Sequence, residues 1–207
     1  MPILRRLSPA LLVAVCAFAC PGTAAAQCTP MNPSFEIAGS SGNVFAGWNQ
    51  YGVLGTSSAA VHGSVAARVS GLNNGTWDFS RYWQQIACDP GESWAGSVTV
   101  MVPSGKPLTG ASKALVNVEW RDAGGNLISY DSFTAADAST PTDLGRVFTF
   151  TTSAAPAGTA ALRLLVGTQQ QPGQPAPDVV FDQVTFHSLA SPTLEEFLTP
   201  DGELKAF

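Results

Sequence analysis

The chain has 207 residues, with 10 Lys and Arg against 15 Asp and Glu, so its formal net charge at pH 7 is −5. An acidic surface repels phosphate backbones, and this balance therefore argues against a nucleic-acid partner. The length is sufficient for one domain with a full hydrophobic core.

Residues 1–26 differ from the rest of the chain and are expected to form a signal peptide. Two adjacent arginines precede an apolar run over 7–19, and residues 23–26 supply the small side chains that a signal peptidase recognises. About 13 apolar residues fall short of the roughly 20 that a spanning helix needs, which disfavours an N-terminal membrane anchor. Cleavage before Gln27 would send an acidic chain, unattached to the membrane, to an extracellular or periplasmic location.

The cysteines fit this destination. Cys16 and Cys20 would leave with the signal peptide, so Cys28 and Cys88 would be the only thiols in an oxidising compartment. We therefore expect one disulfide between Cys28 and Cys88. A buried, free cysteine at position 88 is the alternative.

Residues 27–188 are expected to form a single all-β domain, an antiparallel β-sandwich of the jelly-roll type. Short alternating runs are interrupted about every ten to fifteen residues by Gly, Pro, Asn or Asp clusters, as in such folds. The expected strands span 34–37, 58–61, 65–70, 81–88, 93–102, 114–121, 127–133, 146–152, 160–166 and 179–186. The Gln- and Pro-rich segment 167–177 is expected to be a surface loop.

The tail over 189–207 breaks this pattern. Thr193 is a possible N-cap, followed by Glu195 and Glu196 in the first turn, and 200–202 would end a short helix. The tail is expected to be an extension that docks or frays, with a partner-binding motif as the alternative.

Strand alternation sorts the side chains into two faces. One face is apolar and is predicted to be the core, whereas the other carries an indole among amide, carboxylate and guanidinium groups. An indole can stack on the C–H groups of a pyranose while polar side chains bind its hydroxyls. The sequence thus predicts a carbohydrate-binding face. The alternative is that Trp83 only covers the sheet and that the polar residues are only solvated. The predicted ligand-binding residues are Trp83, Gln85, Asn117, Glu119 and Arg163.

Several motifs in order resemble the cenC-like carbohydrate-binding modules that are attached to bacterial cellulases and xylanases. The chain opens with Asn-Pro-Ser-Phe-Glu at 32–36 and closes with Val-Phe-Asp-Gln-Val-Thr-Phe at 180–186. Between them lie matches at 47–48, 62–69, 84–86, 89–94 and 116–125. The resemblance covers residues 31–188 and implies a jelly-roll sandwich with a sugar cleft on the concave sheet.

The same resemblance implies a structural calcium ion. The opening and closing acids, Glu36 and Asp182, would hold it together with backbone carbonyls near Gly63 and Ser64. Calcium takes six to eight hard oxygen ligands and commonly combines carboxylates with carbonyls, so these residue types suit it. The alternative is that both acids only pair with nearby donors.

The function expected from the sequence is a secreted, non-catalytic, monomeric module that binds a polysaccharide or oligosaccharide. Two other classes are weighed against it. A jelly-roll glycoside hydrolase needs two suitably spaced carboxylates, but no Glu-x-Asp-x-Glu triplet occurs; a polysaccharide lyase could use Tyr130 or Tyr82 with Arg121. An extracellular adhesion or assembly module would bind protein through the same sandwich, because fold alone does not fix function.

Overall fold

The computed structural model describes residues 29–189, which form two antiparallel β-sheets of five strands each. This part of the chain contains no helix, and hence none long and apolar enough to cross a membrane. The expected signal peptide, Cys28 and the expected tail helix lie outside the described residues. The strands are β1 (Asn49–Tyr51), β2 (Val53–Ser57), β3 (Ala66–Ser70), β4 (Asp78–Ala87), β5 (Trp94–Met101), β6 (Lys113–Arg121), β7 (Leu127–Ala136), β8 (Arg146–Thr151), β9 (Ala161–Gln170) and β10 (Asp178–Ser188).

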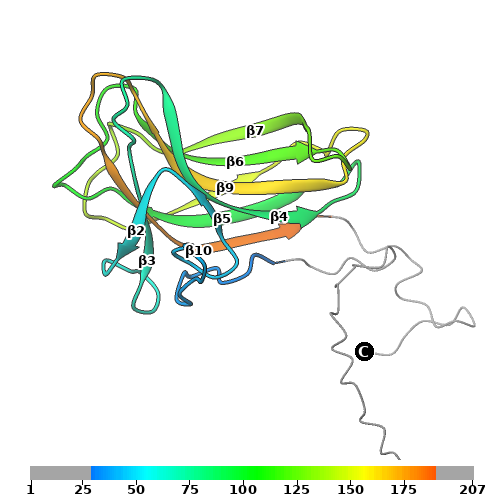
Figure 1. Ribbon diagram of the computed structural model, residues 1–207, viewed down its shortest axis with the longest axis horizontal. Coiled ribbons are helices and arrows are strands. Elements are labelled where there is room, and N and C mark those ends of the chain that lie inside the picture. The colour runs from blue at the N-terminus through cyan, green and yellow to red at the C-terminus, as the bar shows by residue number, and fades with distance from the viewer. Residues whose placement is uncertain (1–28, 190–207) are drawn as a thin grey trace, which may run out of the picture.

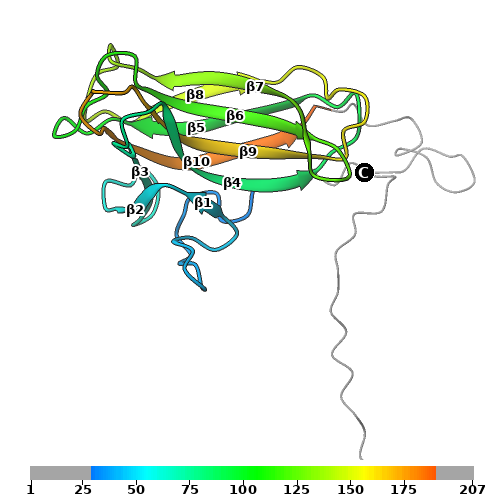
Figure 2. The same cartoon turned by 45° about the horizontal axis from the view of Figure 1, so that its top comes forward.

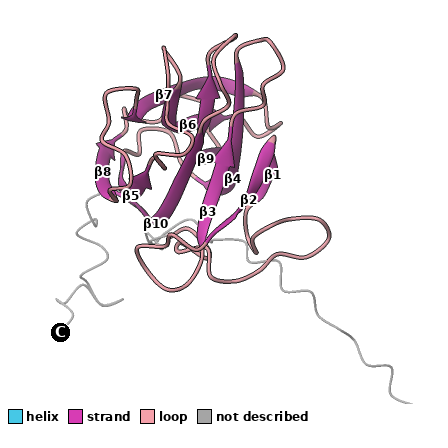
Figure 3. Cartoon of the chain, turned by 90° about the vertical axis from the view of Figure 1, so that its left-hand side faces the viewer, coloured by secondary structure: helices cyan, strands magenta, loops and turns pink. Residues whose placement is uncertain are grey.

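The two sheets lie face to face as the layers of a sandwich (Figures 1 and 2). One sheet has the strand order β1-β4-β9-β6-β7 and the other has the order β2-β3-β10-β5-β8. The chain changes sheet at every connection except β2 to β3 and β6 to β7 (Figure 3). The predicted antiparallel β-sandwich is confirmed.

The core between the sheets contains the side chains that alternation assigns to it. Along β6 and β9, the inward residues Val116, Val118, Trp120, Leu162 and Leu164 are all 0% exposed. Burial of each large apolar side chain contributes about 1.5–3 kcal/mol to folding. The predicted core face is therefore confirmed for these strands.

The expected strand over 34–37 is wrong, because this segment is a turn. Asn32 and Phe35 have positive φ angles of 48° and 57°. The Asn32 side chain donates to the Ile37 carbonyl (2.9 Å) and the Ala46 carbonyl (3.2 Å), which closes a compact loop. Phe35 is fully buried against Phe45 and Trp48, so its apolar side chain serves the core from a loop position.

The start and end of the sheets also differ from expectation. The segment 58–61 is not a strand; the chain forms β1 and β2 earlier, on either side of Gly52, whose φ is 100°. In addition, β9 continues through Gln170, into the segment expected to be a loop, because β4 and β6 pair with it on both sides. Gln170 is satisfied there: its Oε1 accepts from the Asn73 N–H (2.7 Å) and its Nε2 donates to the Gln174 carbonyl (2.7 Å).

Candidate functional site

The five predicted ligand-binding residues all lie on one surface, which we call the Trp83 face. It is the outer face of the β1-β4-β9-β6-β7 sheet. Its central row follows the strand register through Trp83, Leu165 and Asn117. Leu165 points outward but is only 2% exposed, so neighbouring side chains cover it and it gives the face an apolar floor. Trp83 is half-buried and lies in this row on β4, between the edge strand β1 and Leu165 on the central strand β9.

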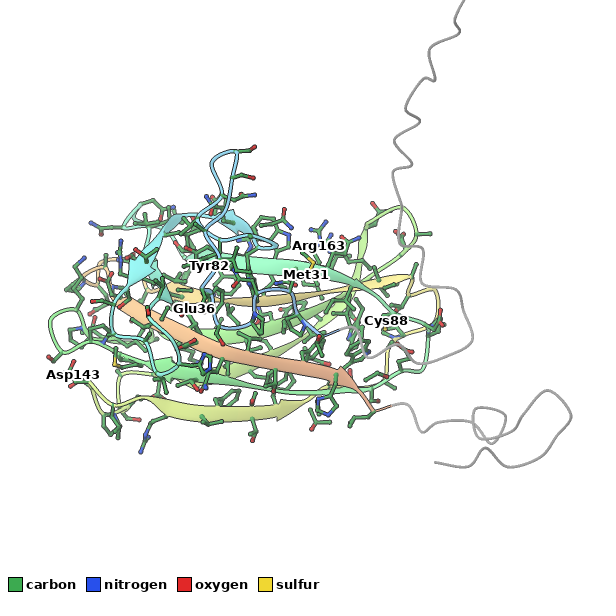
Figure 4. The ribbon with its side chains drawn as sticks, turned by 90° about the horizontal axis from the view of Figure 1, so that it is seen from below. Met31, Glu36, Tyr82, Cys88, Asp143 and Arg163 are labelled. Carbon is green, nitrogen blue, oxygen red and sulfur yellow. The ribbon has the colours of Figure 1, made fainter. Side chains whose placement is uncertain are left out.

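A polar row runs beside Trp83. The register aligns Gln85 with Arg163, Arg163 with Glu119, and Glu119 with Tyr130. Arg163 donates from Nε to Gln85 Oε1 at 3.2 Å, and Figure 4 labels Arg163 among the side chains of the sheet. Glu119 is engaged by the Arg121 guanidinium, whose Nε lies 3.1 Å from Glu119 Oε2. The hydroxyl of Tyr130 is freely reached from solvent, since this residue is 59% exposed.

An aromatic and cationic cluster occupies the other side of Trp83. The Arg81 guanidinium carbon lies 4.8 Å from the ring centre of Tyr51 and 5.7 Å from those of Phe79 and Trp83. Gly167 allows this packing, because a Cβ there would come within 2.7 Å of the Phe79 ring. Guanidinium groups stack well on aromatic faces, so the four side chains support one another.

Sequence reasoning missed Tyr51, Phe79 and Arg81. The alternation that turns Trp83 outward applies equally to Arg81 and Phe79, so their outward position could have been found from the sequence. Tyr51 could not, because it reaches the cluster through the pairing of β1 with β4, which opposes Tyr51 to Arg81.

Asn117 offers an unused acceptor on the same face. Its Oδ1 atom is buried and has no hydrogen-bond partner. A buried polar atom without a partner costs free energy, so this amide is an unsatisfied group directly beneath the face.

The four residues expected at a metal site gather around the loop over 61–65. Glu36 accepts from the N–H groups of Ser64 (3.0 Å) and Val65 (3.0 Å) through Oε1. A Cβ on Gly63, whose φ is 71°, would lie 2.4 Å from the Glu36 carboxyl carbon, so this glycine permits the close approach. The two N–H groups, Val65 first, lower the pKa of Glu36 below its usual value.

Asp182 holds the same loop from the other side and is only 1% exposed. Its Oδ2 accepts from the N–H groups of Val61 and His62, both at 2.8 Å, and its Oδ1 accepts from that of Gln183 at 2.7 Å. The structure thus brings Glu36, Gly63, Ser64 and Asp182 to one loop, where both acids pair with backbone donors.

The donor set around this loop is compatible with a hard cation. Glu36 Oε2 and Asp182 Oδ1 each accept a single N–H, so each keeps a lone pair for a ligand. Within residues 29–189 no three His, Cys, Asp or Glu side chains are grouped closely enough to hold a metal. A calcium ion here would therefore need backbone carbonyls as further ligands.

Two open hollows, each of about 470 Å³, lie away from the Trp83 face. One lies between residues 29–33 and the end of β10, and the other lies on the outer face of the second sheet over β5, β8 and β10. Among residues 29–189, no carboxylate or thiol lines either hollow, and His187 is the ionisable residue that lines both. These hollows therefore present no pair of carboxylates for glycoside hydrolysis.

No protein-family model matches the sequence, and no curated protein sequence is significantly similar to it. The fold is similar to solved structures. The xylan-binding CBM22-1 domain of Xyn10C from Paenibacillus barcinonensis has a TM-score of 0.53 at 18% identity, over 81% of this chain and 99% of that domain.

Enzymes also contain this fold. The enzymatically active domain of tailspike protein 4 from bacteriophage CBA120 has a TM-score of 0.54 at 12% identity, over 77% of this chain. An arabinose-bound GH51 α-L-arabinofuranosidase has a TM-score of 0.54 at 15% identity, over 87% of this chain. The chain spans only 21% and 28% of those two proteins. These similarities establish the fold: this sandwich resembles non-catalytic carbohydrate-binding modules and also occurs as a domain of enzymes.

Proposed function

We propose that the chain is a secreted, non-catalytic module of the cenC-like type that binds a glycan on its Trp83 face. The observation that carries this proposal is a half-buried indole on the outer face of a sheet, with amide, carboxylate, hydroxyl and guanidinium groups around it. The similar CBM22-1 domain is described as xylan-binding, which supports a glycan as the ligand class.

Replacing Trp83 with alanine is expected to weaken glycan binding by about 1–3 kcal/mol, the range for losing an aromatic platform. Affinity electrophoresis against soluble β-glucans, xylans and mannans would first identify the glycan, and titration calorimetry would then compare the variant with the parent. Trp77, which is 52% exposed in the loop before β4, provides the control. Trp77→Ala should leave affinity unchanged, and a Trp83→Ala variant that binds as tightly as the parent would remove Trp83 from the site.

The absence of catalysis is also part of the proposal. Tyr82 is 0% exposed and its hydroxyl donates to the Gly55 carbonyl (3.2 Å), so it cannot reach a substrate. Arg121 already pairs with Glu119 and donates to the Gly125 carbonyl (2.8 Å). Tyr82 and Arg121 are therefore committed to other contacts, whereas Tyr130, the other tyrosine that a lyase could use, is exposed.

An adhesion module remains the second candidate, because the exposed Tyr51 and Tyr130 would suit a protein partner as well. A glycan array separates the two functions. An adhesin should give no signal on the array while still capturing a protein partner.

We also propose that a structural calcium ion binds at Glu36 and Asp182. A metal that binds only the folded state stabilises it by mass action, so EDTA should lower the melting temperature and added calcium should restore it. Glu36→Ala should abolish this response. Differential scanning fluorimetry and elemental analysis provide the measurement, and a melt insensitive to EDTA with no bound metal would refute the site.

A further inference from the structure

We propose that the Trp83 face selects an anionic glycan, one with carboxylate or sulfate groups beside the sugar that stacks on Trp83. This inference rests on the proposed glycan-binding function. It follows from the charge on this face and from two arginines that flank the indole.

The outward side chains of the Trp83 face are basic although the chain is acidic. By register and alternation, the face carries four cationic side chains and one carboxylate, a formal charge of +3. The whole chain has a net charge of −5. These ionisable residues are Arg81, Lys113, Arg121, Arg163 and Glu119.

Among residues 29–189, three of these four cations have no carboxylate within 4 Å, and two of the three, Arg81 and Arg163, flank Trp83. Arg121 pairs with Glu119. The pKa of Asp137 is lowered mainly by hydrogen bonds from Ser139, and Lys113 adds a smaller favourable charge interaction with that carboxylate. In contrast, no carboxylate of residues 29–189 lies within 4 Å of the Arg81 or Arg163 guanidinium. Both are half-buried, so each is partly desolvated without being neutralised.

Neutral neighbours hold both guanidinium groups in place. Arg81 stacks among three rings and donates from one terminal nitrogen to the Phe79 carbonyl at 2.8 Å. Arg163 donates only from Nε, to the Gln85 amide. Each therefore keeps terminal N–H donors that no other described residue uses.

The two arginines lie on opposite sides of Trp83. Arg81 precedes Trp83 by two positions on β4, and Arg163 pairs with Gln85, two positions after it. Alternate residues on a strand are about 7 Å apart, which is within reach of a substituent on a sugar stacked on the indole. A guanidinium binds a carboxylate or sulfate oxygen pair through two parallel hydrogen bonds, which a neutral hydroxyl cannot reproduce.

The test compares charged and neutral forms of the same polymer with the full chain. The probes are polygalacturonate and glucuronoxylan, each beside its carboxyl-reduced form, together with dextran sulfate beside dextran. At least one anionic polymer should bind roughly tenfold more tightly than its neutral counterpart, as expected for charge-assisted hydrogen bonds. The uronate and sulfate arms identify which anion is preferred.

Arg163→Gln and Arg81→Gln should each weaken binding of the preferred anionic polymer about tenfold more than they weaken binding of its neutral form. Arg146→Gln is the matched control, because it removes the same charge from an exposed position on β8 of the other sheet. It should change nothing beyond the twofold level, and melting temperatures of all three variants should confirm that they fold.

The outcomes separate the inference from the function on which it rests. Equal affinity for charged and neutral polymers, with no effect of Arg163→Gln, would overturn anionic selectivity but leave glycan binding intact. An Arg146→Gln loss equal to that of Arg163→Gln would also overturn it, because net charge alone would explain the binding. Binding to none of the six polymers, together with silence on a glycan array, would refute the glycan function itself.

Discussion

Replacing Asp182 with alanine is expected to lower the free energy of unfolding by about 3 kcal/mol. The carboxylate is almost completely buried and accepts three backbone N–H bonds, from Val61, His62 and Gln183. Each bond to a charged acceptor is worth about 1.5–3 kcal/mol when its partner is left unsatisfied. The total loss should be smaller than the sum of the three hydrogen-bond energies. Val61 and His62 are exposed residues, so their N–H groups can bind water instead.

Urea denaturation in EDTA provides the measurement, because chelation separates the hydrogen-bonding effect from any bound calcium. Glu36→Ala is the comparison, since Glu36 holds the same loop but is exposed. It should destabilise the protein clearly less than Asp182→Ala. A loss below about 1 kcal/mol for Asp182→Ala, at an unchanged m-value, would show that the loop does not depend on this carboxylate.

The segment around Asp182 is in contact with two earlier parts of the chain, the turn at 32–37 and the loop over 61–65. The Val184 N–H donates to the Pro33 carbonyl (2.8 Å), which ties the opening turn to β10. The register of β10 against β5 shifts between Asp182 and Thr185, and Gln183 has a φ of 49°. This irregularity lets the Asp182 side chain reach the loop over 61–65. The contact joins residues about 120 positions apart, so it acts as a long-range tie between β10 and the loop before β3.

The Trp83 face could be predicted from the sequence because its main signal is local. Side chains alternate with a period of two along any strand, so Trp83 and Gln85 on β4 share a face once Ile86 is assigned to the core. The same rule placed Asn117 and Glu119 correctly on β6. What the rule cannot provide is which strands are neighbours, and therefore which of these side chains meet.

The errors in the sequence reading arise from contacts between distant segments. The turn at 32–37 depends on the Asn32 side chain closing onto the Ala46 carbonyl, and β1 exists through its pairing with β4. The polar end of β9 looks like a loop in isolation, yet it is a strand because two neighbours pair with it. Each of these features is fixed by a partner that no local pattern identifies.

Reduction of the secreted protein is expected to lower its melting temperature by about 10 °C, because we predict a disulfide between Cys28 and Cys88. Closing a loop of about 60 residues contributes roughly 4 kcal/mol in the chain-entropy model, before any strain. Cys28 itself lies outside the described residues. The prediction therefore depends on the position of residues 29–31, which follow Cys28 directly.

Residues 29–31 lie toward the same end of the sandwich as Cys88. Figure 4 labels Met31 and Cys88 in the same half of the molecule. Met31 exchanges two hydrogen bonds with the Gln84 side chain of β4, at 2.9 and 2.6 Å. Thr29 shares a hollow with Phe186 and His187, at the end of β10 that pairs with the start of β5. Cys88 follows β4, and the hydrogen bond from its N–H to the Ala160 carbonyl (3.4 Å) keeps it beside the start of β9.

Cys88 would be a poor free nucleophile at this position. It is 5% exposed, and burial, followed by its contact with Glu92, raises the pKa of its thiol to about 12. Burial of Cys88 is expected both for a half of a disulfide and for a free structural thiol. The oxidation state of the cysteines in the secreted protein therefore distinguishes the two. Intact-mass analysis after alkylation without reduction should find neither cysteine modified, and Cys28→Ser should melt at the lower temperature whether or not reductant is present. Two alkylated thiols under denaturing conditions, or a Cys28→Ser variant as stable as the parent, would show that Cys88 is only a buried core residue.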